Sequence, residues 1–311
     1  MAISRAQLTK QLIPGLHEII GLNYKMRNDE HKVIFDTIKS SRSFEEEVLM
    51  TGFGEAPIKS EGTGVAYDDA QEAWTQRYVH DTVALAFSIT EEAMEDELYD
   101  TYSRIRAEAL GRALASTKQQ RAADVLNNGF SGTVAPMGDG KALFASDHPL
   151  VGGGTLDNAD TADLSETALE NATINISLFT DDRGILINAM PVSLHIPPQL
   201  QFTAFKILKS DKSTTTATVS GGITNVNDVN ALNSGGYFPG GVHVNHRFTD
   251  TDAWFIKTDV PNGFKHFVRT PMAVATEGDF HTGNLRIKAR ERYSFGVTDF
   301  RAGFGSDGSA S

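Results

Sequence analysis

The sequence predicts an α+β protein with one long helix and several separate strands. The helix is predicted over residues 90–127, where apolar side chains recur every three or four positions and form a narrow apolar stripe. Strands are predicted where apolar residues alternate with polar ones, most clearly at 79–89 and 192–196. A chain of 311 residues can bury a sizeable core, in two domains or in one domain with large excursions.

The first 45 residues are predicted to form an extended arm. Leu8, Leu12 and Leu16 step by four as in a helix, but Pro14-Gly15 interrupts the pattern. The segment shows no self-contained core. We therefore expect it to need another surface to lie on.

Residues 46–89 read as two strands joined by a long loop that is rich in glycine. A two-stranded ribbon alone is only marginally stable in water, so this one needs a partner surface. Trp74 and Tyr78 lie on the face opposite the apolar stripe of the returning strand and add aromatic surface. Either the ribbon folds onto its own domain, or it reaches a neighbouring subunit.

The predicted long helix orders its charges along its axis. Acidic residues fill the first turns and Arg and Lys fill the rest, which is the order that the helix dipole favours. At 1.5 Å per residue the helix would span roughly 55 Å, longer than a typical globular helix. We expect it to serve as a spine.

Residues 164–208 contain the clearest succession of elements in the chain. Ser165 is the predicted N-cap of an amphipathic helix, a turn follows at 181–184, and the strand over 192–196 ends at Pro197-Pro198 before a second helix. Residues 129–163 and 213–241 read as polar loops, and residues 303–311 as a frayed tail. Further short strands are predicted at 242–244, 253–256, 267–269 and 284–295.

Composition limits the classes of protein that the chain can belong to. The net charge of −12 argues against a general nucleic-acid binder, which needs clustered Lys and Arg. The absence of cysteine excludes disulfides and thiolate metal sites and fits a reducing cytoplasm. No segment approaches the length of a membrane span or a signal peptide, so we expect a cytoplasmic product without a membrane partner.

The charges are unevenly distributed. From Phe44 to Asp100 there are fifteen acidic residues against only Lys59 and Arg77, whereas Arg286–Arg301 carries five basic and two acidic residues. Such blocks are solvated faces, or the acidic block on one copy meets a basic block on another.

The sequence predicts no catalytic constellation, no cofactor and no metal site. Gly140-Lys141 has the ending of a phosphate loop, but the first glycine and the hydroxyl residue of that motif are missing. His243 and His246 point to opposite faces of a predicted strand and make a poor ligand pair. Asp147-His148-Pro149 reads as a loop turn, not as a catalytic base with its orienting carboxylate.

Five short segments carry a resemblance to a known family. They are Leu143–Leu150, Leu164–Leu169, Asp181–Ile185, Pro191–Leu200 and Asp252–Phe255. With the order of the elements around them, they resemble the major capsid proteins of tailed phages, which share the Hong Kong 97 fold. They are most similar to the Mu-type major head subunit family.

The resemblance implies a domain organisation. It places an N-terminal arm at 1–45 and an extended β-hairpin loop at 46–89. Residues 90–163 and 281–311 would form a peripheral domain with the long helix as its spine, and 164–280 an axial domain. Neighbouring copies would then bury the arm and the ribbon that the residues leave uncovered.

The resemblance also implies a function. The chain would be a major capsid protein that self-assembles into hexamers and pentamers and forms an icosahedral shell around the phage genome. It would be assembled in the host cytoplasm, reside in the virion and enclose DNA without sequence-specific binding. Its partners would be copies of itself, with separate scaffolding, portal and decoration proteins. The predicted contacts between subunits are Phe53, Lys59, Trp74 and Tyr78.

Three other classes of protein are alternatives. An encapsulin-like compartment that stores a cargo enzyme would share the fold, although the long N-terminal arm favours a virus. A soluble cytoplasmic enzyme with an unrecognised site would show a real pocket with clustered titratable residues. A carbohydrate-binding or adhesive β-protein is disfavoured by the long helix. Some relatives also form Lys–Asn crosslinks, but for Lys59 no partner Asn can be assigned.

Overall fold

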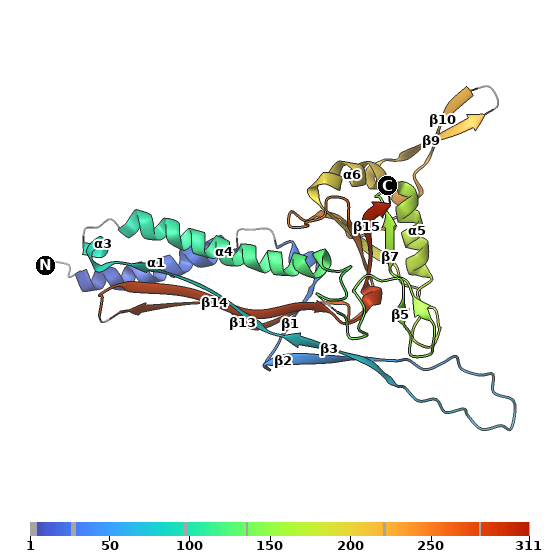
Figure 1. The fold of residues 1–311 in the computed structure, drawn as a ribbon, viewed down its shortest axis with the longest axis horizontal. Coiled ribbons are helices and arrows are strands. Elements are labelled where there is room, and N and C mark those ends of the chain that lie inside the picture. Colours follow the sequence, from blue (N-terminus) through green and yellow to red (C-terminus); the bar gives the residue numbers. More distant parts are fainter. Residues whose placement is uncertain are drawn as a thin grey trace. The chain divides into compact units, whose positions relative to one another are not determined.

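A computed structural model describes residues 5–25, 29–95, 99–134, 136–219, 222–279 and 281–310 (Figure 1). It confirms the mixed α+β class. The described residues form two compact units, each built from segments that are distant in the sequence. Unit 1 draws on Met1–Glu45, Tyr78–Ala122 and His266–Phe295. Unit 2 draws on Glu46–Arg77, Ala123–Lys265 and Gly296–Ser311.

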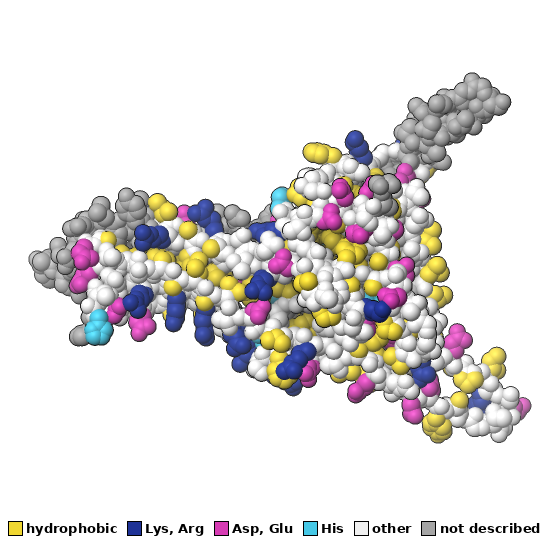
Figure 2. All heavy atoms as spheres, viewed as in Figure 1, with side chains coloured by type: hydrophobic (Ala, Val, Ile, Leu, Met, Phe, Trp, Pro, Cys, Tyr) yellow, Lys and Arg dark blue, Asp and Glu magenta, His cyan; other side chains and the backbone are white. Residues whose placement is uncertain are grey.

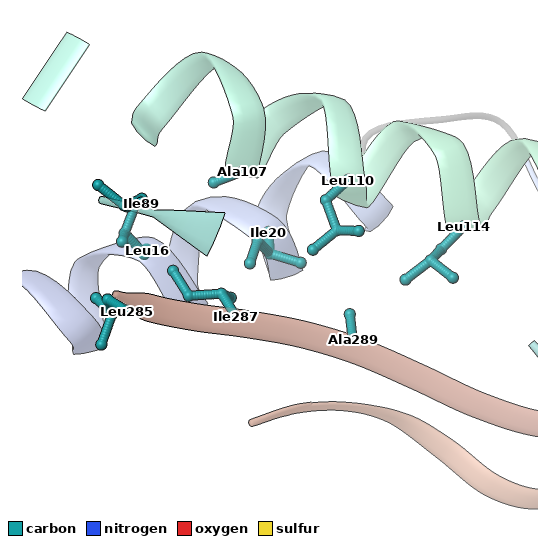
Figure 3. Packing of buried hydrophobic residues seen from close by; sticks show 9 residues of the cluster. All are labelled: Leu16, Ile20, Ile89, Ala107, Leu110, Leu114, Leu285, Ile287 and Ala289. Atoms are coloured by element: carbon teal, nitrogen blue, oxygen red, sulfur yellow. The ribbon is translucent and has the colours of Figure 1, made fainter. Parts of the chain in front are cut away.

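Unit 1 is a sheet with helices on one face (Figures 1 and 3). Its elements are α1 (Arg5–Lys25), α2 (His31–Ile34), β1 (Asp36–Lys39), β4 (Asp81–Ile89), α3 (Glu91–Glu95), α4 (Tyr99–Asn127), β13 (Phe264–Gly278) and β14 (Leu285–Val297). The strand order is β1-β13-β14-β4, and β4 and β14 are antiparallel. The predicted long helix is confirmed over α4, while residues 96–98 lie outside the described part.

The core of unit 1 lies between the helices and the sheet. Alternate residues of β14 are buried, and the residues between them are exposed up to Arg290. The buried residues pack against the facing sides of α1 and α4 (Figure 3). The cluster comprises Leu16, Ile20, Ile89, Ala107, Leu110, Leu114, Leu285, Ile287 and Ala289.

Gly111 lets α1 and α4 approach closely. A Cβ atom at this position would lie 2.6 Å from the carbonyl oxygen of Ile20, so any other side chain would push the helices apart. A glycine inside a helix costs about 0.5–1 kcal/mol relative to alanine. Close packing of the two helices offsets that cost.

A buried ion pair joins α1, α4 and β14. Lys118 Nζ lies 3.1 Å from Glu291 Oε2, and the Tyr24 hydroxyl donates to the same oxygen at 2.7 Å. Burial and the charge of Glu291 raise the pKa of Tyr24. Removing one partner would leave the other charge buried and uncompensated, so the contact holds the three elements in one register.

Two buried histidines lie where the arm meets the sheet. His31 of α2 packs edge-on against His266 of β13 at 5.2 Å between ring centroids, and His266 stacks on Phe295 at 4.3 Å. Burial, together with the charge of Lys118, lowers the pKa of His31 to about 4 and that of His266 to about 3. Both rings are therefore neutral in the folded protein near neutral pH.

Acidification is expected to destabilise unit 1. Because both folded-state pKa values lie below the ordinary value of 6.5, the unfolded chain binds more protons once the pH falls below 6.5, and stability declines towards pH 4. Thermal melts followed by circular dichroism should show a lower midpoint at about pH 5 than at about pH 7. His266→Phe, which keeps an aromatic ring against Phe295, should weaken this dependence. Equal midpoints in the unsubstituted protein would contradict the neutral buried pair.

Unit 2 is built around a five-stranded sheet. The strand order is β11 (Gly241–Val244), β8 (Pro191–Ile196), β12 (Trp254–Thr258), β15 (Gly303–Ala310) and β7 (Ala159–Ala162). β12 is antiparallel to both of its neighbours, whereas β11 and β7 pair in parallel with β8 and β15. The strand predicted at 253–256 is present as β12, and it lies in the core, because Trp254 is fully buried and its Nε1 donates to the Ala162 carbonyl at 3.0 Å.

The remaining elements of unit 2 flank this sheet or extend from it (Figure 1). They are β2 (Phe44–Met50), β3 (Glu72–Val79), β5 (His148–Pro149), β6 (Thr155–Leu156), α5 (Glu166–Ser177), η1 (Pro198–Leu200), α6 (Gln201–Lys209), β9 (Lys212–Val219), β10 (Gly222–Val229), α7 (Ala231–Ser234) and η2 (Phe300–Ala302). Ser165 caps α5 as predicted, accepting from the Ala168 amide at 3.1 Å. The predicted loop over 213–241 was wrong, because β9 and β10 form an antiparallel hairpin there.

The prediction of a frayed tail at 303–311 was also wrong. The glycines that suggested fraying lie in β15, between β12 and β7. They are required by packing, because a Cβ atom on Gly305 would lie 2.9 Å from the Phe144 ring. Phe144 in turn stacks on Phe255, so the tail covers the aromatic core of unit 2.

The unit boundaries differ from the predicted domains at three strands. β4, predicted within the extended loop at 46–89, pairs with β14 in the sheet of unit 1. β13, predicted within the axial domain at 164–280, lies in the same sheet. β15, predicted within the peripheral segment 281–311, belongs to the sheet of unit 2. In each case the strand pairs with a segment distant in the chain, which local patterns do not report.

Gly305→Val is expected to destabilise unit 2. The branched side chain must displace the Phe144 ring, and overpacking of this kind costs about 1–3 kcal/mol. Urea unfolding followed by tryptophan fluorescence measures the loss. Ser309→Val, on the exposed part of the same strand, is the matched control. Equal midpoints for the two variants would show that the tail does not pack as described.

Candidate functional site

The most exposed apolar surface of unit 2 lies on the extended loop, Gly52–Gln71, between β2 and β3 (Figures 1 and 2). Ile58 and Tyr67 are each 99% exposed, Val65 is 69% exposed and Phe53 is 63% exposed. Exposed apolar residues gathered on one projection are typical of a surface that another molecule covers.

The base of the loop is fixed by hydrogen bonds. The Thr51 amide donates to the Gln71 carbonyl at 2.8 Å, and the Gln71 amide donates to Thr51 Oγ1 at 2.9 Å. Asp68 accepts from the Gly54 amide at 2.7 Å, and this bond lowers the pKa of the carboxyl group. Arg183 donates to Asp68 at 3.3 Å and to the Asp69 carbonyl at 2.7 Å. The loop therefore leaves unit 2 from a defined position.

The four predicted contact residues have different environments. Phe53 and Lys59 are exposed on the loop. Trp74 is half-buried, 5.9 Å from the Phe300 ring and packed on Gly138, where a Cβ atom would lie 2.9 Å from Trp74 Cδ1. Contacts of these three residues with another subunit stay predictions.

Tyr78 is placed differently from what the sequence suggested. Only 3% of it is exposed, and its ring lies 4.9 Å from that of Phe267. Its aromatic surface is therefore used within the subunit, against Phe267. The alternation of residues showed which face Tyr78 occupies but not what covers that face.

A second exposed apolar surface lies on α6 and was not predicted from the sequence. On α6, Phe202 is 75% exposed and Phe205 is 61% exposed, while Ala204 and Leu208 of the same helix are buried. The sequence contains a sign of this surface, because Phe202 and Phe205 fall outside the apolar stripe that Ala204 and Leu208 define. Sequence alone could not say which of the two stripes faces the core.

The cleft beside the loop base carries no recognisable chemistry. It has a volume of about 430 Å³ and includes Asp181, Asp182, Asp299 and Arg301 in its lining. Arg301 donates to Asp182 at 3.0 Å and pairs with Asp299 at 3.3 Å, and burial raises the pKa of Asp299. The Arg301 guanidinium thus bridges two buried carboxyl groups and holds the cleft wall together.

His148 also has a structural role. Its side chain is fully buried, and its Nδ1 lies 2.6 Å from Asp139 Oδ2. The imidazole ring also stacks on the Phe300 ring, with 3.9 Å between the ring centroids. Among the described residues, no group of three or more His, Asp or Glu could hold a metal ion. No helix in the described part of the chain is long and apolar enough to cross a membrane.

Comparison with solved structures gives the class of fold. The chain is similar to the virus-like particle protein from Pyrococcus furiosus, with a TM-score of 0.55, 12% identity, and 94% of this chain and 98% of that one covered. It is also similar to the SrpI encapsulin of Synechococcus elongatus PCC 7942, with a TM-score of 0.53, 10% identity, and 91% of this chain and 89% of that one covered. The procapsid of bacteriophage JBD30 is similar with a TM-score of 0.51 and 13% identity, and 98% of this chain and 76% of that one are covered. At these identities the likeness shows the fold alone, which is that of shell-forming proteins.

The family model described as "Phage capsid protein" matches residues 71–305. The chain therefore belongs to this phage capsid protein family. No curated protein matches it in sequence. The predicted resemblance to tailed-phage capsid proteins of the Hong Kong 97 type is confirmed at this level, and family membership implies a structural role in the capsid of a virion.

Removing apolar groups from the loop should impair association without affecting folding. Ile58→Ser with Tyr67→Ser changes two side chains that are 99% exposed, so the melting temperature should stay within about 2 °C of the original. Particle yield, measured by sedimentation, should fall sharply. Phe202→Ser provides a comparison at the other exposed apolar surface. Full particle yield from the loop variant would exclude the loop from the interface.

Proposed function

We propose that this protein is the major capsid protein of a tailed phage, of the Mu-type head subunit kind. It self-assembles into hexamers and pentamers that close an icosahedral shell around the genome. The match of residues 71–305 to the phage capsid protein family is the observation that carries this proposal.

The exposed apolar surfaces supply the driving force for assembly. Each apolar square ångström removed from water contributes about 25 cal/mol before the costs of association. Most of the surface of the loop side chains and of the α6 phenylalanines is available for such burial. Many modest contacts of this kind, repeated around each ring and between rings, stabilise a closed shell.

Each segment of the subunit has a place in the proposed shell. The loop Gly52–Gln71 reaches a neighbouring copy, whereas the described part of the predicted arm (1–45) packs within its own subunit, where Leu16 and Ile20 of α1 are buried. Unit 1 supplies most of the peripheral domain, and the sheet of unit 2 with α5 and α6 forms the axial domain. Scaffolding, portal and decoration proteins are further partners, and assembly takes place in the host cytoplasm. The shell encloses DNA without reading its sequence.

An encapsulin-like compartment is the second candidate, favoured by the fold similarity to the SrpI encapsulin over 91% of this chain. The two functions differ in their contents. Particles purified with nuclease-resistant DNA from infected cells support a phage head, whereas particles that retain one folded cargo protein support a compartment.

The first experiment is to measure the size of the purified recombinant protein by light scattering and negative-stain microscopy. Closed particles, or rings of five or six copies, are expected because the apolar loop and α6 favour burial between copies. The measurement should span protein concentration and ionic strength. A compact monomer under every condition, also with candidate scaffolding protein added, would contradict the proposed shell.

A further inference from the structure

The turn between β12 and β13 contains an Asn-Gly pair in an uncommon backbone conformation. Asn262 has a φ of 60°, in the left-handed region that few residues other than glycine adopt. Proline before asparagine, as at Pro261-Asn262, favours a turn with this conformation at its third residue. Asn262 is exposed to solvent, whereas Gly263 is buried. The turn therefore presents a side-chain amide to water from a backbone that its neighbours hold.

Packing determines which residue follows Asn262. A Cβ atom on Gly263 would lie 2.0 Å from the Cβ atom of Ala302, so glycine is required there. The Gly263 carbonyl accepts from the Thr298 amide at 3.1 Å. Among the described residues, however, the Gly263 amide has no hydrogen-bond acceptor. Its nitrogen adjoins the Asn262 side chain, carries no steric screen and is not engaged elsewhere in the fold.

A buried cation lies against the carbonyl oxygen of the Asn262 side chain. Lys265 is buried, and its Nζ pairs with Glu47 and donates to Asn262 Oδ1 at 3.2 Å. The Thr298 hydroxyl donates to the same Glu47 carboxylate at 2.7 Å, which holds the pair in place. A fixed positive charge at a carbonyl oxygen stabilises the negative charge that develops there when a nucleophile adds to the carbon. The Asn262 amide is thereby activated towards attack.

We propose that Asn262 is a site of self-modification, at which its side chain cyclises onto the backbone of Gly263. The Gly263 nitrogen attacks Asn262 Cγ and forms a five-membered succinimide ring. The bond from Cγ to Nδ2 breaks, and Nδ2 leaves as ammonia with the proton that the Gly263 nitrogen gives up. Water then opens the ring at either carbonyl and leaves aspartate or isoaspartate at position 262. Water is the only other reactant.

A second Asn-Gly pair in the chain lacks these features. Asn128 Nδ2 donates to the Asp124 carbonyl at 2.8 Å, and the Gly129 amide donates to the Leu126 carbonyl at 2.8 Å. Both bonds must break before the Gly129 nitrogen can reach the side chain of Asn128. Each of the two pairs is followed by phenylalanine, so their local sequences are alike. A difference in their reactivity therefore reports the folded environment.

The product of the modification suits its surroundings. Asn262 lines the cleft beside the loop base, and a carboxylate at this position would give Lys265 a second partner beside Glu47. Arg301 already bridges two buried carboxyl groups in the same cleft. The modification therefore adds one negative charge to each copy and places it next to a cation, which limits the cost of the new charge.

The test is peptide mass spectrometry of the full chain during storage in mildly alkaline buffer. The peptide with Asn262 should gain the mass that separates a hydroxyl from an amino group. It should convert about tenfold or more faster than the peptide with Asn128, because two hydrogen bonds protect the latter. In guanidinium chloride, which unfolds the chain, the two rates should become equal. Asn262→Gly removes the amide, suits the left-handed backbone and is the control that should show no change at this position.

The role of Lys265 is tested by Lys265→Gln with Glu47→Gln, which removes both buried charges together. Conversion at Asn262 should slow, while conversion at Asn128 should stay the same. Circular dichroism checks that each variant is folded. An unchanged rate at Asn262 in the folded double variant would overturn the part assigned to the ammonium group.

Other results overturn the self-modification itself. One is equal conversion of Asn262 and Asn128 in the folded protein, and another is an Asn262 peptide that converts only after unfolding. A lasting loss of one ammonia that resists hydroxylamine would show attack by Lys265 Nζ in place of the Gly263 nitrogen. All of these measurements use the unassembled chain, so their outcome is independent of the proposed shell function.

Discussion

The close packing of α1 and α4 on one face of the four-stranded sheet is the constraint on which unit 1 depends. It requires a glycine at position 111, because the Ile20 carbonyl occupies the space of a side chain. It also commits alternate residues of β14, among them Ile287, to the core. The other face of the same strand is left to solvent and carries Arg286, Lys288 and Arg290. Core packing and surface charge are thus two consequences of one strand period.

The side chains that hold the subunit together differ from those that the proposed shell would use to join subunits. The buried Lys118–Glu291 pair and the aromatic core around Phe144 use their surfaces inside one chain. Ile58, Tyr67 and Phe202 contribute little to the fold, because most of each side chain is exposed. A chain that maintains such side chains in water gains from them only when a second molecule covers them.

Most of the local elements could be predicted, but their partners could not. Ser165 predicted the start of its helix because an N-cap bonds to residues close in sequence, and the structure contains that hydrogen bond. The β9–β10 hairpin was missed because its polar residues give no alternation of apolar and polar positions. At Gly305 the error was the opposite one. The glycines of this segment predicted a frayed tail, but Gly305 is needed because the Phe144 ring packs where its side chain would lie.

The sequence by itself determined the α+β fold class and the positions of the charged blocks, because both are local properties of the chain, and the resemblance of five short segments indicated the capsid family. Only the tertiary structure decided how those blocks are used. Tyr78 is buried against Phe267 although its strand resembles a free ribbon, and Arg286, Lys288 and Arg290 form one row because β14 buries every second residue. Burial depends on contacts between segments far apart in the chain, and those contacts are set by packing in three dimensions.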